Sequence, residues 1–75
     1  RLSEMAIIVR LDVMLALRKM TSRELSAKIG LSEQNLSMLR SGKARGVRFN
    51  TLEAICKELE CQPGDLLEFV PDGAG

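Results

Sequence analysis

The segment SEQNLSMLRSGKARGVRF, residues 32–49, carries side chains suited to binding rather than to catalysis. Lys43, Arg45 and Arg48 follow one another closely and supply three positive charges. Upstream, Gln34 offers a carboxamide that both donates and accepts hydrogen bonds. Clustered cations of this kind favour a polyanion as ligand. The alternative is that the basic stretch is only a solvated, flexible linker.

Charge is distributed unevenly along the 75 residues, whose formal net charge is only +1. Residues 1–48 hold ten Lys/Arg and four Asp/Glu, a balance of +6, whereas residues 49–75 hold one Lys and six Asp/Glu, a balance of −5. A basic half joined to an acidic half indicates one polyanion-binding face and one face that avoids polyanions. A chance distribution of surface charge is the other interpretation.

Residue types needed for catalysis or metal binding are missing. Histidine is absent, and Cys56 and Cys61 are five apart, which fits neither a CxxC redox motif nor a zinc pair. We find no glycine-rich phosphate loop with a lysine and no nucleophile–base pair. The sequence therefore predicts no enzyme activity, no cofactor and no metal. Cys56 is expected to be a buried free thiol, which fits a reducing cytoplasm.

Length and hydropathy predict one small domain, which we place at residues 5–70. Met5 is a candidate native first residue, with residues 1–4 a possible remnant of expression, and residues 71–75 are expected to form a flexible tail. Trp and Tyr are absent, so the core must be aliphatic. No apolar run approaches the roughly 20 residues needed to cross a bilayer, so no membrane association is expected.

Two short helices are predicted to position the basic segment. Thr21 and Glu24 form a capping box that starts one helix, and Gly30 ends it as a left-handed cap. Ser32 then caps a second helix, which ends near Ser41. Two helices separated by about three residues that include a glycine are typical of a helix-turn-helix.

Further elements are expected on both sides of this pair. Residues 5–11 are rich in β-branched types and predict a short strand. A helix at 10–19, apolar on more than one face, should be central or covered on two sides. A helix over about 51–60, capped by Thr51 or Asn50, carries an i, i+3, i+4, i+7 apolar stripe. A helical turn at 65–67 and a terminal strand in EFVP, residues 68–71, complete the prediction.

The stretch MTSRELSAKIGLSEQNLSMLRSGKARGVRFNTLEAICKELECQPGDLLEF resembles the Cro/C1-type helix-turn-helix domain of the XRE class, in its short stand-alone form. The resemblance covers about residues 10–69. It implies an all-α, lambda-repressor-like bundle of four or five short helices, with an optional short pairing of terminal β-strands. It also implies binding to double-stranded operator DNA, usually as a dimer. We expect a cytoplasmic homodimer that acts as a repressor, although the sequence itself does not separate repression from activation.

One position departs from the family pattern. Relatives often carry an arginine on the first helix that pairs internally with a glutamate near the end of the third. The matching residues here are Leu15 and Arg40, so both ends of the pair have changed. Arg40 is then expected to be free to face a phosphate, or else to be an ordinary solvated cation.

A helical wheel separates the faces of the third helix, with Leu36 and Leu39 inward. Given the resemblance, the residues expected to read bases in the major groove are Glu33, Gln34, Ser37 and Met38. Gln34 can bond adenine N6 and N7, and Met38 can contact a thymine methyl. The alternatives are a solvated amide for Gln34 and core filler or a partner contact for Met38. Residues expected at the DNA backbone are Ser22, Arg23, Ser32, Asn35, Arg40, Ser41, Lys43, Arg45 and Arg48.

Two other functions compete with this interpretation. An antitoxin or adaptor would bind another protein with its acidic half, and a purely structural bundle would bind no nucleic acid. A homodimer should recognise half-sites about one helical turn apart, roughly 34 Å. Its candidate interface is the apolar N-terminal strand together with the C-terminal LLEFVP.

Overall fold

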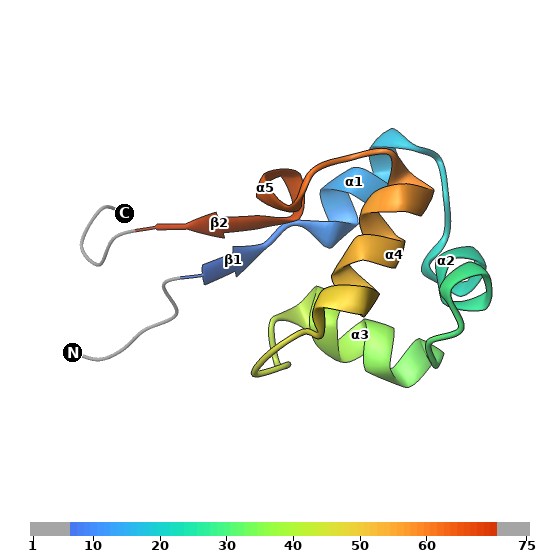
Figure 1. Cartoon of the computed structure of the whole chain (residues 1–75), viewed down its shortest axis with the longest axis horizontal. Helices are drawn as coiled ribbons and strands as arrows, with labels where there is room; N and C mark the ends of the chain where they lie inside the picture. The colour runs from blue at the N-terminus through green and yellow to red at the C-terminus, as the bar shows by residue number, and fades with distance from the viewer. Residues whose placement is uncertain (1–6, 71–75) are drawn as a thin grey trace.

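The computed structural model describes residues 7–70. In this part of the chain, seven elements follow one another in the order β1 (Ile7–Val9), α1 (Leu11–Leu17), α2 (Ser22–Ile29), α3 (Glu33–Ser41), α4 (Phe49–Leu59), α5 (Pro63–Leu66) and β2 (Leu67–Phe69). The helices form the body, and the two strands form a ribbon that projects from one side of it (Figure 1). The predicted helical bundle with a short pairing of terminal strands is confirmed.

An aliphatic core draws on every helix. It consists of buried Leu11, Met14, Leu15, Leu25, Leu36, Ile55, Leu59 and Leu66. Each helix supplies a narrow apolar stripe, and burial of these stripes is the main source of stability in so small a domain. Because Leu36 is fully buried, α3 is fixed in its rotation about its own axis.

The two strands pair antiparallel, with Ile7 opposite Phe69 and Val9 opposite Leu67. Directly after β1, the Arg10 N–H donates to the Leu66 carbonyl at 2.7 Å and extends the pairing toward the body. Both predicted strands are thus present. Strand β1 ends at Val9 rather than at residue 11, and β2 begins one residue earlier than predicted and ends at Phe69. The predictions for residues 1–4, for Met5 and for residues 71–75 lie outside the described residues.

Helix α1 differs from its prediction in length and in coverage. It ends at Leu17 rather than at residue 19, and Lys19 adopts a positive φ of 54°. Val13 and Leu17 are 51% and 63% exposed, so α1 is covered on one side only and the expected burial on two sides is wrong. Their spacing of four residues forms one stripe, and that stripe faces outward.

The starts of α4 and α5 also differ from prediction. Helix α4 begins at Phe49, and its N-cap is Arg48, whose side chain makes no capping bond. Asn50 and Thr51 lie inside its first turn, so neither caps it. Helix α5 begins two residues earlier than expected because Pro63 suits the first helical position.

Among residues 7–70, no helix combines the length and the apolar character needed to span a membrane. Nor does any group of three or more potential metal ligands come together in this range.

Candidate nucleic-acid interface

Local hydrogen bonds set the geometry of α2, as the sequence predicts. The Thr21 N–H donates to Glu24 Oε1 at 2.9 Å, and Thr21 Oγ1 accepts from the Glu24 N–H at 3.0 Å. The Thr21 N–H bond, together with a weaker bond that the Thr21 hydroxyl donates to the same oxygen at 3.3 Å, lowers the pKa of the Glu24 carboxyl, because both bonds stabilise its charged form. Gly30 then ends α2 with a φ of 73°, a left-handed conformation that glycine adopts without strain.

The start and end of α3 are fixed in the same way. Ser32 Oγ accepts from the Asn35 N–H at 3.1 Å, so the Ser32 side chain is engaged as a cap. At the other end Gly42 has a φ of 81°. The two helices therefore meet through a tight turn and form the predicted helix-turn-helix, which is confirmed.

The outward face of α3 is polar and open. Gln34, Ser37 and Ser41 are exposed, and Met38 is 42% exposed, while Leu36 on the opposite side is fully buried. The predicted inward and outward faces are thus confirmed. Ser41 Oγ donates to the Met38 carbonyl at 3.2 Å, which ties this side chain to its own helix.

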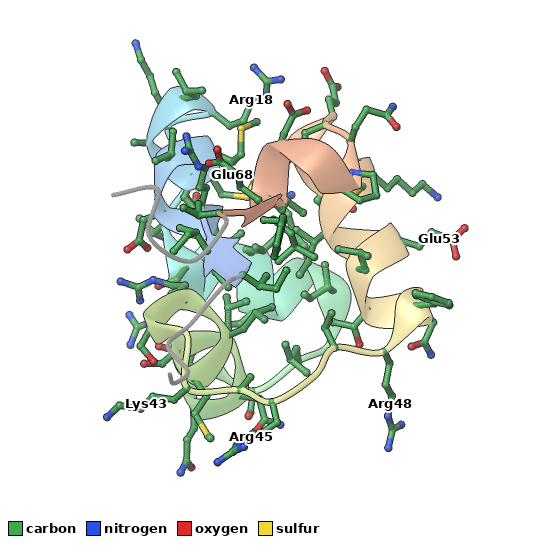
Figure 2. All side chains as sticks on the ribbon, turned by 90° about the vertical axis from the view of Figure 1, so that its left-hand side faces the viewer. Arg18, Lys43, Arg45, Arg48, Glu53 and Glu68 are labelled. Carbon is green, nitrogen blue, oxygen red and sulfur yellow. The ribbon has the colours of Figure 1, made fainter. Side chains whose placement is uncertain are left out.

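Cations lie along the same side of the molecule as α3. Lys43, Arg45 and Arg48 are exposed and project from the lower edge of the molecule, where Figure 1 places α3 (Figure 2). Arg18 and Glu68 lie toward the opposite end in the same view. The loop is anchored to α3, because the N–H groups of Lys43 and Ala44 both donate to the Met38 carbonyl, at 3.0 and 3.1 Å.

The N-terminal turns of α2 and α3 approach each other. Arg23 Nε lies 3.5 Å from Glu33 Oε2, and both side chains are largely exposed. Glu33 therefore has a cationic neighbour in the free protein, and this contact reduces its repulsion of a nearby phosphate. Ser22, which is half-buried, lies one residue before Arg23 at the start of the same helix.

Arg40 corrects one prediction. Its Nε lies 2.6 Å from Asp12 Oδ1 on α1, and one of its terminal nitrogens donates to Ser22 Oγ at 3.4 Å. The expectation that Arg40 is free is therefore wrong. Leu15 belongs to the core, so an ion pair between the first and third helices exists here with the acid on α1 and the base on α3.

Asn35 faces the loop side of α3. It lines an open groove of about 500 Å³ together with Met38, Arg45 and Arg48. Its amide thus lies beside loop cations, on the same side of α3 as the segment that leads to α4.

Two features were missed by sequence reasoning. The Arg18 side chain caps the C-terminus of α4 by donating to the carbonyls of Leu59 and Glu60, at 2.6 and 3.0 Å. The expectation that Cys56 is buried is wrong, because it is only half-buried, like Cys61; both thiols are free. Burial and the neighbouring Cys56 thiol raise the pKa of Cys61, so this thiol is a weak nucleophile at neutral pH.

A model of the Cro/C1-type HTH DNA-binding domain matches residues 10–72, most of the chain. The chain belongs to this family. Its members are DNA-binding transcriptional regulators, so membership of the family confirms the prediction that the protein is not an enzyme.

Individual relatives agree with this assignment. The chain is 60% identical over 68 residues to YozG of Bacillus subtilis strain 168, an uncharacterized HTH-type transcriptional regulator, covering 91% of this chain and 81% of YozG. The transcriptional regulator VanUg shares its fold with a TM-score of 0.69 at 32% identity, over 96% of this chain and 97% of that one. A protein from Bacteroides fragilis, described as DNA-binding, superposes with a TM-score of 0.73 at 27% identity, over 83% of this chain and 98% of its own.

Proposed function

We propose that this Cro/C1-type protein is a sequence-specific regulator of transcription that acts in the cytoplasm as a repressor. Helix α3 enters the major groove of operator DNA, and the protein binds as a homodimer. The observation that carries the proposal is that the exposed polar face of α3 and the cations Lys43, Arg45 and Arg48 lie along one side of the molecule.

Base recognition is assigned to the start and middle of the outward face. Gln34 would bond an adenine edge, Met38 would contact a thymine methyl, and Ser37 would tolerate several bases. Glu33 would accept from cytosine N4, with Arg23 beside it neutralising part of its charge. The supporting fact is that Leu36 is buried and Leu39 packs against the core, which leaves this side of α3 without cover from the rest of the described chain.

Backbone contacts are assigned to both sides of α3. Arg23 and Ser22 at the N-terminus of α2 would bind one phosphate strand, where free helix N–H groups favour anions. Lys43, Arg45 and Arg48 would bind the other. Four further candidates for phosphate contact are Asn35, Ser32, Ser41 and Arg40. The side chains of the last three already have hydrogen-bond partners within the chain, and each of these three would have to share or exchange its partner with a phosphate.

Salt dependence of binding to DNA from upstream of the protein's own gene tests the proposal. Phosphate contacts release counterions, so the logarithm of the association constant should fall linearly with the logarithm of salt concentration. Lys43→Ala and Arg48→Ala should each lower that slope by about one unit and weaken preferred and random DNA by similar factors. Lys57→Ala is the matched control, because Lys57 lies in the last turn of α4, outside the segments assigned to DNA contact. Salt-independent binding, or no preference for any upstream fragment, contradicts the proposal.

An antitoxin or adaptor role is the second candidate, and Phe49 favours it. This side chain is 86% exposed and borders a groove of about 300 Å³ that Glu53, Cys56 and Pro63 also line. An exposed aromatic beside an acidic residue suits a partner protein with apolar and basic side chains. Co-expression with the product of the adjacent gene tests it: a complex of fixed stoichiometry that Phe49→Ala abolishes would support this role.

A further inference from the structure

One face of the β-ribbon presents apolar side chains to solvent. Ile7 and Phe69 are directly opposite in the register and share a face, and they are 46% and 65% exposed. Val9 and Leu67, the next pair on that face, pack against the core. The ribbon thus extends the core outward, and Ile7 and Phe69, the last apolar pair on this face within residues 7–70, are exposed.

A groove opens beside this face. It has a volume of about 770 Å³ and is bounded by Ile7, Val9 and Leu67 of the ribbon, by Leu39 of α3, and by loop residues 42–47. We call it the ribbon groove. Its charged lining residues, Lys43 and Arg45, are both cationic. Phe69 stands on the same face of the ribbon but outside this lining.

We infer that the ribbon groove receives Phe69 of a second copy of this chain, and that each copy exchanges this side chain with the other across a two-fold axis. The inference rests on the proposed homodimer and names its interface. A projecting aromatic and an apolar groove on one face of one chain are self-complementary. A two-fold interface needs this arrangement, because the same patch must supply both sides of the contact.

The position of the ribbon favours a second copy over another partner. The ribbon projects from the side of the body where α3 ends, and α3 itself lies along the lower side (Figure 1). With the two-fold axis along the vertical of Figure 1, pairing through the ribbon turns the α3 sides of both copies the same way. Two recognition helices can then enter successive major grooves on one side of the DNA.

The interface would also act on the DNA contacts. Loop residues 42–47 form one wall of the groove and carry Lys43 and Arg45, so an inserted Phe69 restrains the segment assigned to phosphate. Each insertion also brings Lys43 and Arg45 of one copy close to the same residues of the other. Their repulsion should weaken the free dimer at low salt, and either added salt or bound phosphate should relieve it.

Opposite salt dependences are the consequence. Dimerisation of the free protein should strengthen with rising salt, whereas binding to DNA should weaken. We expect sedimentation equilibrium of the full chain to show a monomer–dimer equilibrium that shifts toward dimer between low and high salt. Dimerisation that weakens with salt would contradict the charge argument.

A matched pair of variants locates the interface. Phe69→Ala should raise the dimer dissociation constant at least tenfold, and Phe49→Ala, which removes the other exposed phenylalanine, should leave it unchanged. Equal effects of the two variants, or no effect of Phe69→Ala, would overturn the inference. If wild-type protein is monomeric both free and on DNA but still prefers its operator, this interface is refuted while base reading by α3 stands.

Cross-linking distinguishes exchange from simple contact between ribbons. Phe69→Cys protein is mixed with differently tagged Ala44→Cys protein and oxidised with diamide, with wild-type protein as the control for Cys56 and Cys61. Exchange predicts a disulfide between the two tagged chains in the mixture. A cross-link in Phe69→Cys protein alone would instead place the two ribbons side by side and would overturn the insertion of Phe69 into the groove.

Discussion

The contact between Asp12 and Arg40 determines whether Arg40 stabilises the fold or is available to bind a DNA phosphate. The two side chains meet at 2.6 Å, but they are 35% and 63% exposed, so water screens much of their attraction. Exposed pairs typically contribute about 0.2–1 kcal/mol, and this short contact should lie near the upper end. We therefore expect a coupling free energy of about 0.5–1 kcal/mol.

The assay is a double-mutant cycle of Asp12→Ala and Arg40→Ala, with the free energy of unfolding measured in urea for all four proteins. The control is the same cycle on Arg23 and Glu33, which lie 3.5 Å apart with side chains 84% and 60% exposed. That pair should couple by close to zero. A coupling between Asp12 and Arg40 as small as that of the control would refute the argument.

DNA binding supplies a second readout for the same pair. If Asp12 holds Arg40, then Asp12→Asn frees the guanidinium for a phosphate and removes a negative charge from the nearby surface. The salt slope of binding to random duplex should then steepen by up to about one unit. An unchanged slope, with strong coupling in the unfolding cycle, would mean that Arg40 has a structural role only.

Two further predictions concern the helix ends. Gly42→Ala should lower the free energy of unfolding by about 1 kcal/mol, because alanine is strained at a φ of 81° even though no atom crowds the added Cβ. The control is Gly46→Ala, which is also uncrowded but has no positive φ and should change the free energy of unfolding by less than about 0.5 kcal/mol. Urea unfolding compares the two variants. The lowered pKa of Glu24 means that its stabilisation is present above the ordinary carboxyl pKa and is lost as pH falls through the folded-state value. Wild-type protein should therefore exceed Glu24→Gln in stability at pH 7, and thermal melts should converge as the pH falls through the lowered pKa of Glu24. A gap independent of pH would contradict this.

Local signals made the helix-turn-helix predictable. Thr21, Glu24, Gly30 and Ser32 each act through bonds or dihedral angles within three residues, and the structure shows each in its predicted place. The buried positions of α3 followed from helical periodicity, because one face of a helix next to a core must be apolar. The side of α3 that holds Gln34 could therefore be predicted from periodicity alone.

Contacts between distant residues could not be predicted in this way. Nothing in the spacing of Asp12 and Arg40 shows that α1 and α3 bring them together, and Arg18 reaches the end of α4 across 41 residues of sequence. The exposure of Val13 was equally hidden, since an apolar residue on a helix does not reveal which faces are covered. The start of α4 was missed because Arg48 precedes the first helical residue without any capping bond from its side chain.

The ribbon groove shows a further limit. Its walls come from both ends of the chain, from α3 and from the loop, so it exists only once β1 and β2 have paired. The sequence indicated apolar terminal strands, but the position of Phe69 beside this groove follows only from the register.

The central claim is that α3 recognises bases, whereas the loop between α3 and α4 binds the DNA backbone. Competitive binding of each variant against a library of single-base operator variants tests it most directly. Gln34→Ala should cost about 1–3 kcal/mol on the preferred site and relax the choice at one base position, whereas Arg48→Ala should weaken all library members by similar factors. If Arg48→Ala changes the preferred base while Gln34→Ala leaves the profile unchanged, α3 does not lie in the major groove as proposed.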